Sequence, residues 1–242
     1  AGEVIQRPAS VVKELLENAI DAGSNEINVF IKDGGKTSIV IQDNGKGMTP
    51  DDALLSFKRH STSKLKSVDD LFSMTTKGFR GEALASISAI AQVAMKTKHQ
   101  DSKENGFHIE YSGGKLLQKE EFVCEIGTTI EVKNLFFNVP ARRSFLKSDS
   151  VEFTHLRHEF ERIAMAHNDV KLTLSQNNVE IYNLPVGNLR KRITDILGKN
   201  SNEKLVPISE NTDIVSVTGF VGKPESAKKT RGEQFFFVNN RF

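Results

Sequence analysis

The chain has almost no cysteine. Cys124 is the single cysteine among 242 residues, so an intrachain disulfide is excluded and no pair of thiols is present for a zinc site. Proteins that keep free thiols belong mainly to reducing compartments, whereas disulfides belong to oxidising ones. We therefore expect an intracellular location.

Long apolar runs and a strong excess of one charge are also missing. No apolar run approaches the roughly 18 residues that indicate a membrane-spanning helix. The 33 basic and 31 acidic residues give a net charge of +2, which argues against a strongly basic nucleic-acid-binding protein but leaves room for a local basic patch. With 38% hydrophobic and 26% charged residues, the composition is that of a globular protein.

The sequence has no signal peptide and no initial methionine, and no internal repeat or low-complexity tract. Ala1 opens directly into a patterned segment, so we interpret the chain as part of a longer protein whose first element precedes Ala1. A chain of this length suits one large domain, or one domain with a smaller partner.

Residue periodicity predicts helices that alternate with strands. Residues 8–22 form the clearest helix, with Pro8 in the first turn, Gly23 after the end and apolar residues at helical spacing. A pair of strands follows at 27–31 and 38–41, joined by a turn. A short helix is predicted to begin at residues 49–52. Further helices are predicted at 81–91, 141–147, 151–166 and 188–197, with strands between them.

This order of elements predicts an α+β protein. Over residues 1–198 we expect an α/β sandwich with a mostly antiparallel sheet. Three later strand-like stretches, at 205–208, 214–221 and 234–238, predict the truncated start of a second small α/β domain at 199–242.

Polar residues on the first helix are the first candidate for chemistry. Glu14, Asn18 and Asp21 are spaced i, i+4 and i+7, so they share a stripe that faces away from the apolar residues. Taken alone, such a stripe is more often a solvated helix face.

The segment after the second strand, Asp43-Asn44-Gly45-Lys46-Gly47-Met48, is the second candidate. Its glycines permit close approach of the backbone to a ligand. An ionised Asp43 only accepts hydrogen bonds, so it suits an exocyclic amino group such as that of adenine. By itself the string is equally an ordinary turn.

Two more pieces complete the set. Gly78-Phe79-Arg80-Gly81-Glu82-Ala83-Leu84 is a glycine-bracketed loop that runs into a helix, a junction whose free N–H groups suit an anion. Gly127-Thr128-Thr129 enters a strand and is uninformative alone. By contrast, Gly34-Gly35-Lys36-Thr37 is no P-loop, because position 30 is Phe30 rather than glycine and the string lies in a hairpin.

In this order the four pieces resemble the four ATP-site motifs of the GHKL superfamily, which includes gyrase, heat-shock chaperones of the ninety-kilodalton class, histidine kinases and MutL. Longer strings resemble the MutL family of DNA mismatch repair proteins: residues 1–4, 7–15, 78–87, 140–143 and 145–147. The resemblance covers essentially the whole chain. It implies the Bergerat ATP-binding fold, followed by the start of a domain similar to the second domain of ribosomal protein S5.

The resemblance also implies roles for individual residues, with ATP and Mg²⁺ as cofactors. Glu14 matches the general base that activates the attacking water, a role that suits a carboxylate. Asn18 matches the Mg²⁺ ligand, and Asp43 matches the residue that binds adenine. The remaining nucleotide contacts would be Gly45, Gly47 and Met48 in the pocket, Thr62, Ser63 and Lys64 at the start of the lid, Gly78, Phe79, Arg80, Gly81, Glu82, Ala83 and Leu84 in the phosphate loop, and Thr128 and Thr129 on the supporting strand.

For the whole protein the resemblance implies an ATP-driven switch that couples mismatch recognition to strand processing. Its partners would be a MutS-type mismatch-recognition protein, a second copy bound in the presence of ATP, and DNA bound without sequence specificity, with no membrane. Each candidate DNA contact is equally a scattered surface charge: Arg142, Arg143, Lys223, Lys228, Lys229, Arg231 and Arg241.

In the MutL family an arm that precedes Ala1 contributes to dimerisation, and a lysine beyond Phe242 senses the γ-phosphate. We therefore expect Mg²⁺-dependent ATPase activity to be weak or absent in these 242 residues alone. Two alternatives stay open, namely another GHKL ATPase, such as that of a type II topoisomerase, and a non-catalytic DNA-binding module.

Overall fold

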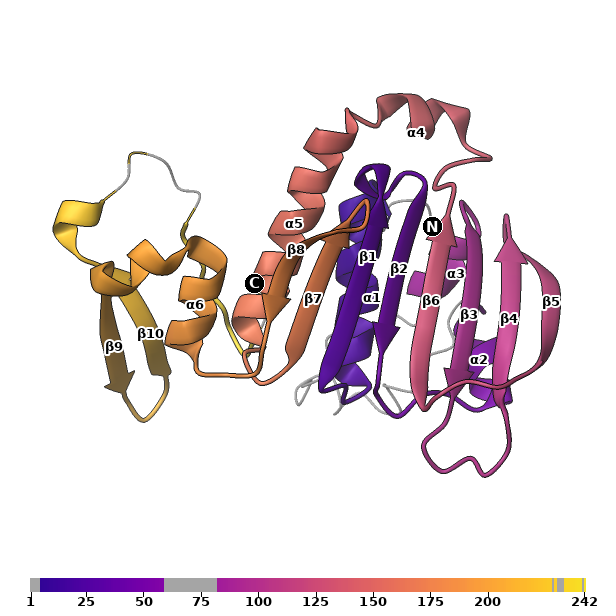
Figure 1. The fold of residues 1–242 in the computed structure, drawn as a ribbon, viewed down its shortest axis with the longest axis horizontal. Helices are drawn as coiled ribbons and strands as arrows, with labels where there is room; N and C mark the ends of the chain where they lie inside the picture. Colours follow the sequence, from indigo (N-terminus) through magenta and orange to yellow (C-terminus); the bar gives the residue numbers. More distant parts are fainter. Residues whose placement is uncertain (1–4, 59–81, 228, 230–232, 241) are drawn as a thin grey trace.

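The computed structural model describes residues 5–58, 82–227, 229, 233–240 and 242. Its centre is an eight-stranded sheet in the order β5-β4-β3-β6-β2-β1-β7-β8 (Figure 1). The strands are β1 Glu26–Lys32, β2 Ser38–Asp43, β3 Gln92–Lys98, β4 Gly106–Ser112, β5 Lys115–Phe122, β6 Gly127–Lys133, β7 Lys171–Gln176 and β8 Val179–Leu184.

Among these strands only β1 and β7 pair in parallel, while the other neighbours are antiparallel. The predicted α+β class with a mostly antiparallel sheet is therefore confirmed. The string 34–37 lies between β1 and β2, where residues Asp33–Gly35 form a short 3₁₀ turn, η1.

Helices cover one face of the sheet and leave the other open (Figure 1). The described helices are α1 Pro8–Asp21, α2 Pro50–Ser56, α3 Ala83–Ser88, α4 Pro140–Phe145, α5 Asp149–Ala166 and α6 Leu189–Leu197. On β1 the side chains of Ile27, Val29 and Ile31 are buried, whereas Phe30 is 45% exposed. Since successive strand residues face opposite sides, this alternation separates the covered face from the open one.

Helix α1 forms as its sequence predicts. Pro8 occupies the first turn, where its missing N–H costs nothing, and Arg7 before it is extended. Val11, Val12, Leu15 and Leu16 are all buried against the sheet and α5. Burial of a large apolar side chain contributes about 1.5–3 kcal/mol, so this one stripe fixes α1 firmly on the covered face.

Beyond β8 the chain forms a smaller unit beside the sheet (Figure 1). Helix α6 leads from β8 to this unit, which contains the 3₁₀ segment η3 Lys199–Lys204 and the antiparallel pair β9 Leu205–Asn211 and β10 Ser216–Gly222. The guanidinium of Arg192 on α6 is buried and donates to carbonyl oxygens of Ala164, His167, Asn168, Val170 and Pro185, at 2.8–3.5 Å. This side chain attaches α6 to the ends of α5, β7 and β8.

Two predicted elements differ from the structure. The helix predicted at 81–91 is shorter, because it ends at Ser88 before a turn into β3. The stretch predicted as a strand at 234–238 is not one: residues 234–237 lie in neither helix nor strand, and Val238 makes a bridge only. Strand propensity needs a neighbouring strand to supply hydrogen bonds before it produces a strand.

None of the helices in the described part of the chain combines the length and the apolarity required to cross a membrane.

Candidate functional site

Asp43, the last residue of β2, is the centre of the candidate site. Its Oδ1 accepts hydrogen bonds from the backbone N–H of Gly45 at 2.9 Å and from the Ser24 hydroxyl at 3.0 Å. The backbone N–H of Thr128 on β6 is a further donor to this carboxylate. Burial raises the pKa of Asp43, and the three hydrogen bonds oppose that rise without cancelling it.

Ser24 joins Asp43 to the C-terminal end of α1. Its buried hydroxyl lies 2.7 Å from the carbonyl oxygen of Ala19, in the last turns of the helix, as well as 3.0 Å from Asp43. The backbone N–H of Lys46 donates to the carbonyl oxygen of Ala22 at 3.0 Å. The loop after β2 is therefore packed directly on the end of the helix that carries Asn18.

Glycines make this close packing possible. A Cβ on Gly45 would lie 2.6 Å from Ser24 Oγ and 2.9 Å from the carbonyl oxygen of Ala22. Gly47 has a φ of +64°, and a Cβ there would collide with the carbonyl oxygen of Lys98. A side chain at either position would push the loop away from its neighbours.

The neighbouring strands add two threonines to the site. Thr97 on β3 and Thr128 on β6 are buried with their hydroxyl oxygens 3.1 Å apart, and Thr97 Oγ1 accepts from the backbone N–H of Met48 at 2.9 Å. Thr128 stands opposite Asp43 in the β2–β6 register. Thr129 follows Thr128 along the strand, so it faces the open side of the sheet and lies apart from this cluster.

The predicted residues of α1 lie beside this cluster. Glu14 and Asn18 are both half-buried, and the backbone carbonyl of Asn18 accepts from Ala22 at 3.0 Å where the helix ends. Because Ala22 also accepts the bond from Lys46, Asn18 lies about one helical turn from the residue that binds the loop of Asp43. Among the described residues no three His, Cys, Asp or Glu side chains gather closely enough to hold a metal ion.

Part of the predicted phosphate site lies outside the described residues, namely Thr62, Ser63, Lys64, Gly78, Phe79, Arg80 and Gly81. Glu82 precedes α3 and is half-buried, as is Ala83, and Leu84 is buried in the core. The structure thus brings Asp43, Gly45, Gly47, Met48 and Thr128 together, and it places α3 beside α1. The roles of these residues stay predictions.

The predicted DNA contacts are dispersed. Arg142 is half-buried on α4 and donates to the carbonyl oxygen of Ile5 at 3.4 Å, while Arg143 beside it is exposed. Lys223 and Lys229 are exposed in the smaller unit. Lys228, Arg231 and Arg241 lie outside the described residues.

Sequence analysis did not identify Ser24, Asn25, Thr97 or the side chain of Asn44 as part of the site. Ser24 lies 19 residues from Asp43 and Thr97 lies 49 residues from Met48, so no local pattern connects them. Thr128, in contrast, was predicted, and it shares the parity of the apolar residues Ile130 and Val132 on its strand.

Comparison with known proteins places these motifs in a family. A family model described as histidine kinase-, DNA gyrase B- and HSP90-like ATPase matches residues 6–133. A second model, DNA mismatch repair protein, C-terminal domain, matches residues 193–242. The DNA mismatch repair proteins MutL of Flavobacterium psychrophilum, Christiangramia forsetii and Bacteroides fragilis are 60%, 58% and 52% identical over the whole chain.

The chain belongs to the MutL family of these ATPases. It spans 39% of the length of the three relatives.

Solved structures agree with this assignment. The Aquifex aeolicus MutL ATPase domain complexed with ADP is 28% identical with a TM-score of 0.67, over 86% of this chain and 73% of that one. The N-terminal domain of a DNA repair protein gives a TM-score of 0.82 at 27% identity, over 99% of this chain and 75% of that one. The fold around Asp43 is thus that of a MutL ATPase domain.

The steric fit of Gly47 leads to a first prediction. Gly47→Ala should destabilise the protein by about 1–2 kcal/mol for its positive φ and by a further ~1–3 kcal/mol for the collision with the carbonyl of Lys98. Gly23→Ala is the matched control, because Gly23 also has a positive φ, +76°, but has no atom within 4 Å of the added Cβ. Denaturant unfolding measures the loss of folding free energy in both variants. Equal losses would show that the backbone at Gly47 has room to move.

Proposed function

We propose that this chain binds ATP at the cluster around Asp43 and that Glu14 and Asn18 provide for its Mg²⁺-dependent hydrolysis. The observation that carries the proposal is the partly buried Asp43 carboxylate. It is packed against the end of the helix that bears the two other residues. In the whole protein, hydrolysis would drive a conformational switch in DNA mismatch repair.

The hydrogen bonds of Asp43 leave room for adenine. A carboxylate offers about four acceptor positions, and Gly45, Ser24 and Thr128 occupy three of them. The remaining position suits the exocyclic amino group of adenine. Guanine presents a carbonyl oxygen at the corresponding place, which an ionised Asp43 would repel.

The polar residues Glu14 and Asn18 on α1 would act on the phosphates. Mg²⁺ takes few protein ligands and keeps water and phosphate oxygens around it, so the neutral oxygen of Asn18 is a fitting ligand. The bound ion would neutralise charge that develops on the phosphates. Glu14, one turn earlier on the helix, would orient and deprotonate the attacking water.

The proposed partners belong to the whole protein, of which this chain would form the ATPase region. They are a MutS-type mismatch-recognition protein, a second copy bound in the presence of ATP, and DNA, all inside the cell. Binding to DNA would depend on the phosphate backbone, because charged contacts of this kind carry no sequence information.

A prediction for Glu14 separates binding from catalysis. Glu14→Ala should keep the ATP dissociation constant within a few-fold and lower turnover by roughly 10²–10⁴-fold, because a general base acts in the transition state. Binding is measured on this chain and turnover on the full-length protein. Glu17→Ala, which removes the same half-buried group from the same helix, is the control. Equal losses of binding and turnover in Glu14→Ala would assign Glu14 a structural role instead.

A second prediction follows from the raised pKa of Asp43. Because the pKa of Asp43 is raised above its ordinary value of 3.8, the contribution of Asp43 to folding is fully present below pH 3.8 and is lost as the pH rises through the folded-state pKa. Asp43→Asn does not titrate, so its stability relative to the parent chain should increase as the pH rises above about 4. The same variant should bind ATP more weakly. Thermal unfolding across this range tests the sign, and a relative stability that decreases with pH would contradict it.

DNA binding by backbone charge makes a third prediction. Affinity for duplex DNA should fall steeply with salt, and Arg143→Glu should weaken binding to every sequence about equally. Lys119→Glu, which reverses an exposed charge on the edge strand β5, serves as the control. Equal effects of both variants in salt titrations would mean that α4 is not a specific contact.

A further inference from the structure

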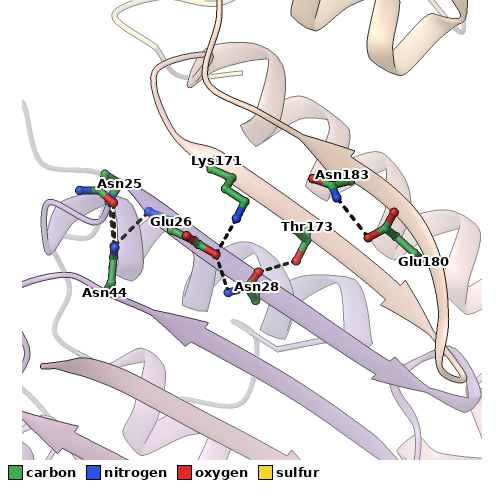
Figure 2. Close-up of polar contacts among 8 residues, drawn as sticks. All are labelled: Asn25, Glu26, Asn28, Asn44, Lys171, Thr173, Glu180 and Asn183. Atoms are coloured by element: carbon green, nitrogen blue, oxygen red, sulfur yellow. Dashed lines mark hydrogen bonds and ion pairs between the residues drawn. The ribbon is translucent and has the colours of Figure 1, made fainter. Parts of the chain in front are cut away.

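The side chain of Asn44 is held away from Asp43, on the outer side of the loop. Its Oδ1 accepts hydrogen bonds from the backbone N–H groups of Asn25 and Glu26, both at 3.0 Å, and its Nδ2 donates to Asn25 Oδ1 at 2.7 Å. Figure 2 shows these contacts bridging the end of β2 and the beginning of β1. One side chain therefore makes three hydrogen bonds to a single short segment.

These bonds continue the β1–β2 ladder past its last backbone pair. The ladder ends where Asp43 stands opposite Ile27, and the backbone N–H of Asn44 still reaches the carbonyl of Glu26 at 3.3 Å. After this point the chain leaves the sheet towards Gly45. The side-chain amide of Asn44 thus makes its hydrogen bonds at the point where backbone pairing ends and the loop around Asp43 begins.

The segment 25–28, to which the side chain of Asn44 is bonded, is itself fixed to the sheet. Lys171 Nζ donates to Glu26 Oε1 at 3.0 Å, and the backbone N–H of Lys171 donates to the carbonyl of Asn25 at 2.9 Å. Thr173 Oγ1 donates to Asn28 Oδ1 at 2.7 Å. Figure 2 shows this row of polar contacts running across β1 and β7. A side chain attached to this row is attached to the rigid sheet rather than to a free loop.

We propose that Asn44 is a positioning residue for nucleotide recognition, which clamps the loop after β2 to the start of β1 and so sets the place of Asp43. The proposal rests on the proposed function, in which Asp43 binds the amino group of adenine. Ser24 and Gly45 hold the carboxylate from the inner side, and Asn44 holds the same loop from the outer side. A binding group is selective only if its supporting contacts fix it to within a fraction of an ångström.

The clamp should matter more for selectivity than for stability. Its three hydrogen bonds are exposed, so water replaces them readily and their net contribution to folding is small. A displacement of about 1 Å at a binding group, in contrast, reduces its effect by up to roughly a hundredfold. Loss of the clamp should therefore reduce the preference for ATP over GTP, which a merely structural role would leave unchanged.

A graded series of variants tests this. Asn44→Leu keeps the branched shape of the side chain and removes all three hydrogen bonds, whereas Asn25→Ala removes only the bond from Asn44 Nδ2. Asn44→Asp keeps an acceptor for both backbone N–H groups and should restore most of the parental behaviour. The dissociation constants of ATP and GTP and the melting temperature are measured for each variant of this chain.

We expect the ratio of the GTP and ATP dissociation constants to fall roughly tenfold or more in Asn44→Leu, less in Asn25→Ala and least in Asn44→Asp, with little change in melting temperature. An unchanged ratio in Asn44→Leu would overturn the clamp while the proposed function stands. A ratio that falls only together with the melting temperature would also overturn it. If the unaltered chain shows no preference for ATP, the proposed function itself fails, and the clamp fails with it.

Discussion

The candidate site depends on keeping one carboxylate partly out of water at the end of a strand. Burial works against the ionised form of Asp43, so the surrounding backbone has to supply donors at short range. Gly45 and Thr128 supply two N–H groups, and Ser24 supplies a hydroxyl. This requirement brings the end of β2, the start of β6 and the end of α1 to one point, and it explains why the loop contains glycine where a Cβ would meet its neighbours.

Helix α1 connects that point to the proposed catalytic residues. Its apolar stripe is immobilised by the sheet and α5, and its C-terminal end is tied to Asp43 through Ser24. Asn18 and Glu14 therefore stand at distances from Asp43 that are set by the helix itself, one turn apart. A group that binds the base and groups that act on phosphates share a single rigid element, which is the preorganisation that hydrolysis of a bound nucleotide requires.

Sequence patterns predicted the local elements of this fold well, because helix caps, proline positions and alternation are local properties. The bounds of α1 and the cap of α2, where Thr49 Oγ1 accepts from Asp52 N at 3.2 Å, follow from neighbouring residues. The parallel pairing of β1 with β7 and the contact of Ser24 with Asp43 depend on segments distant in sequence, and no periodicity reports them. Asp43 was found because of its motif, whereas Asn44, its neighbour, was overlooked because its partners, Asn25 and Glu26, carry no motif.

Helix α6 is attached to the sheet by a buried arginine. Arg192 is buried, and this desolvation lowers the pKa of its guanidinium, so the charge needs hydrogen-bond partners inside the protein. It donates to carbonyls at the ends of α5, β7 and β8, so α6 is part of the same packed body as the sheet. Gly198, which follows α6, has a φ of +93°, and no atom lies within 4 Å of an added Cβ there. Arg190 on the same helix donates to Asn202 Oδ1 at 3.1 Å and to the carbonyl oxygen of Leu205 at 2.6 Å, so α6 also holds the segment that follows it.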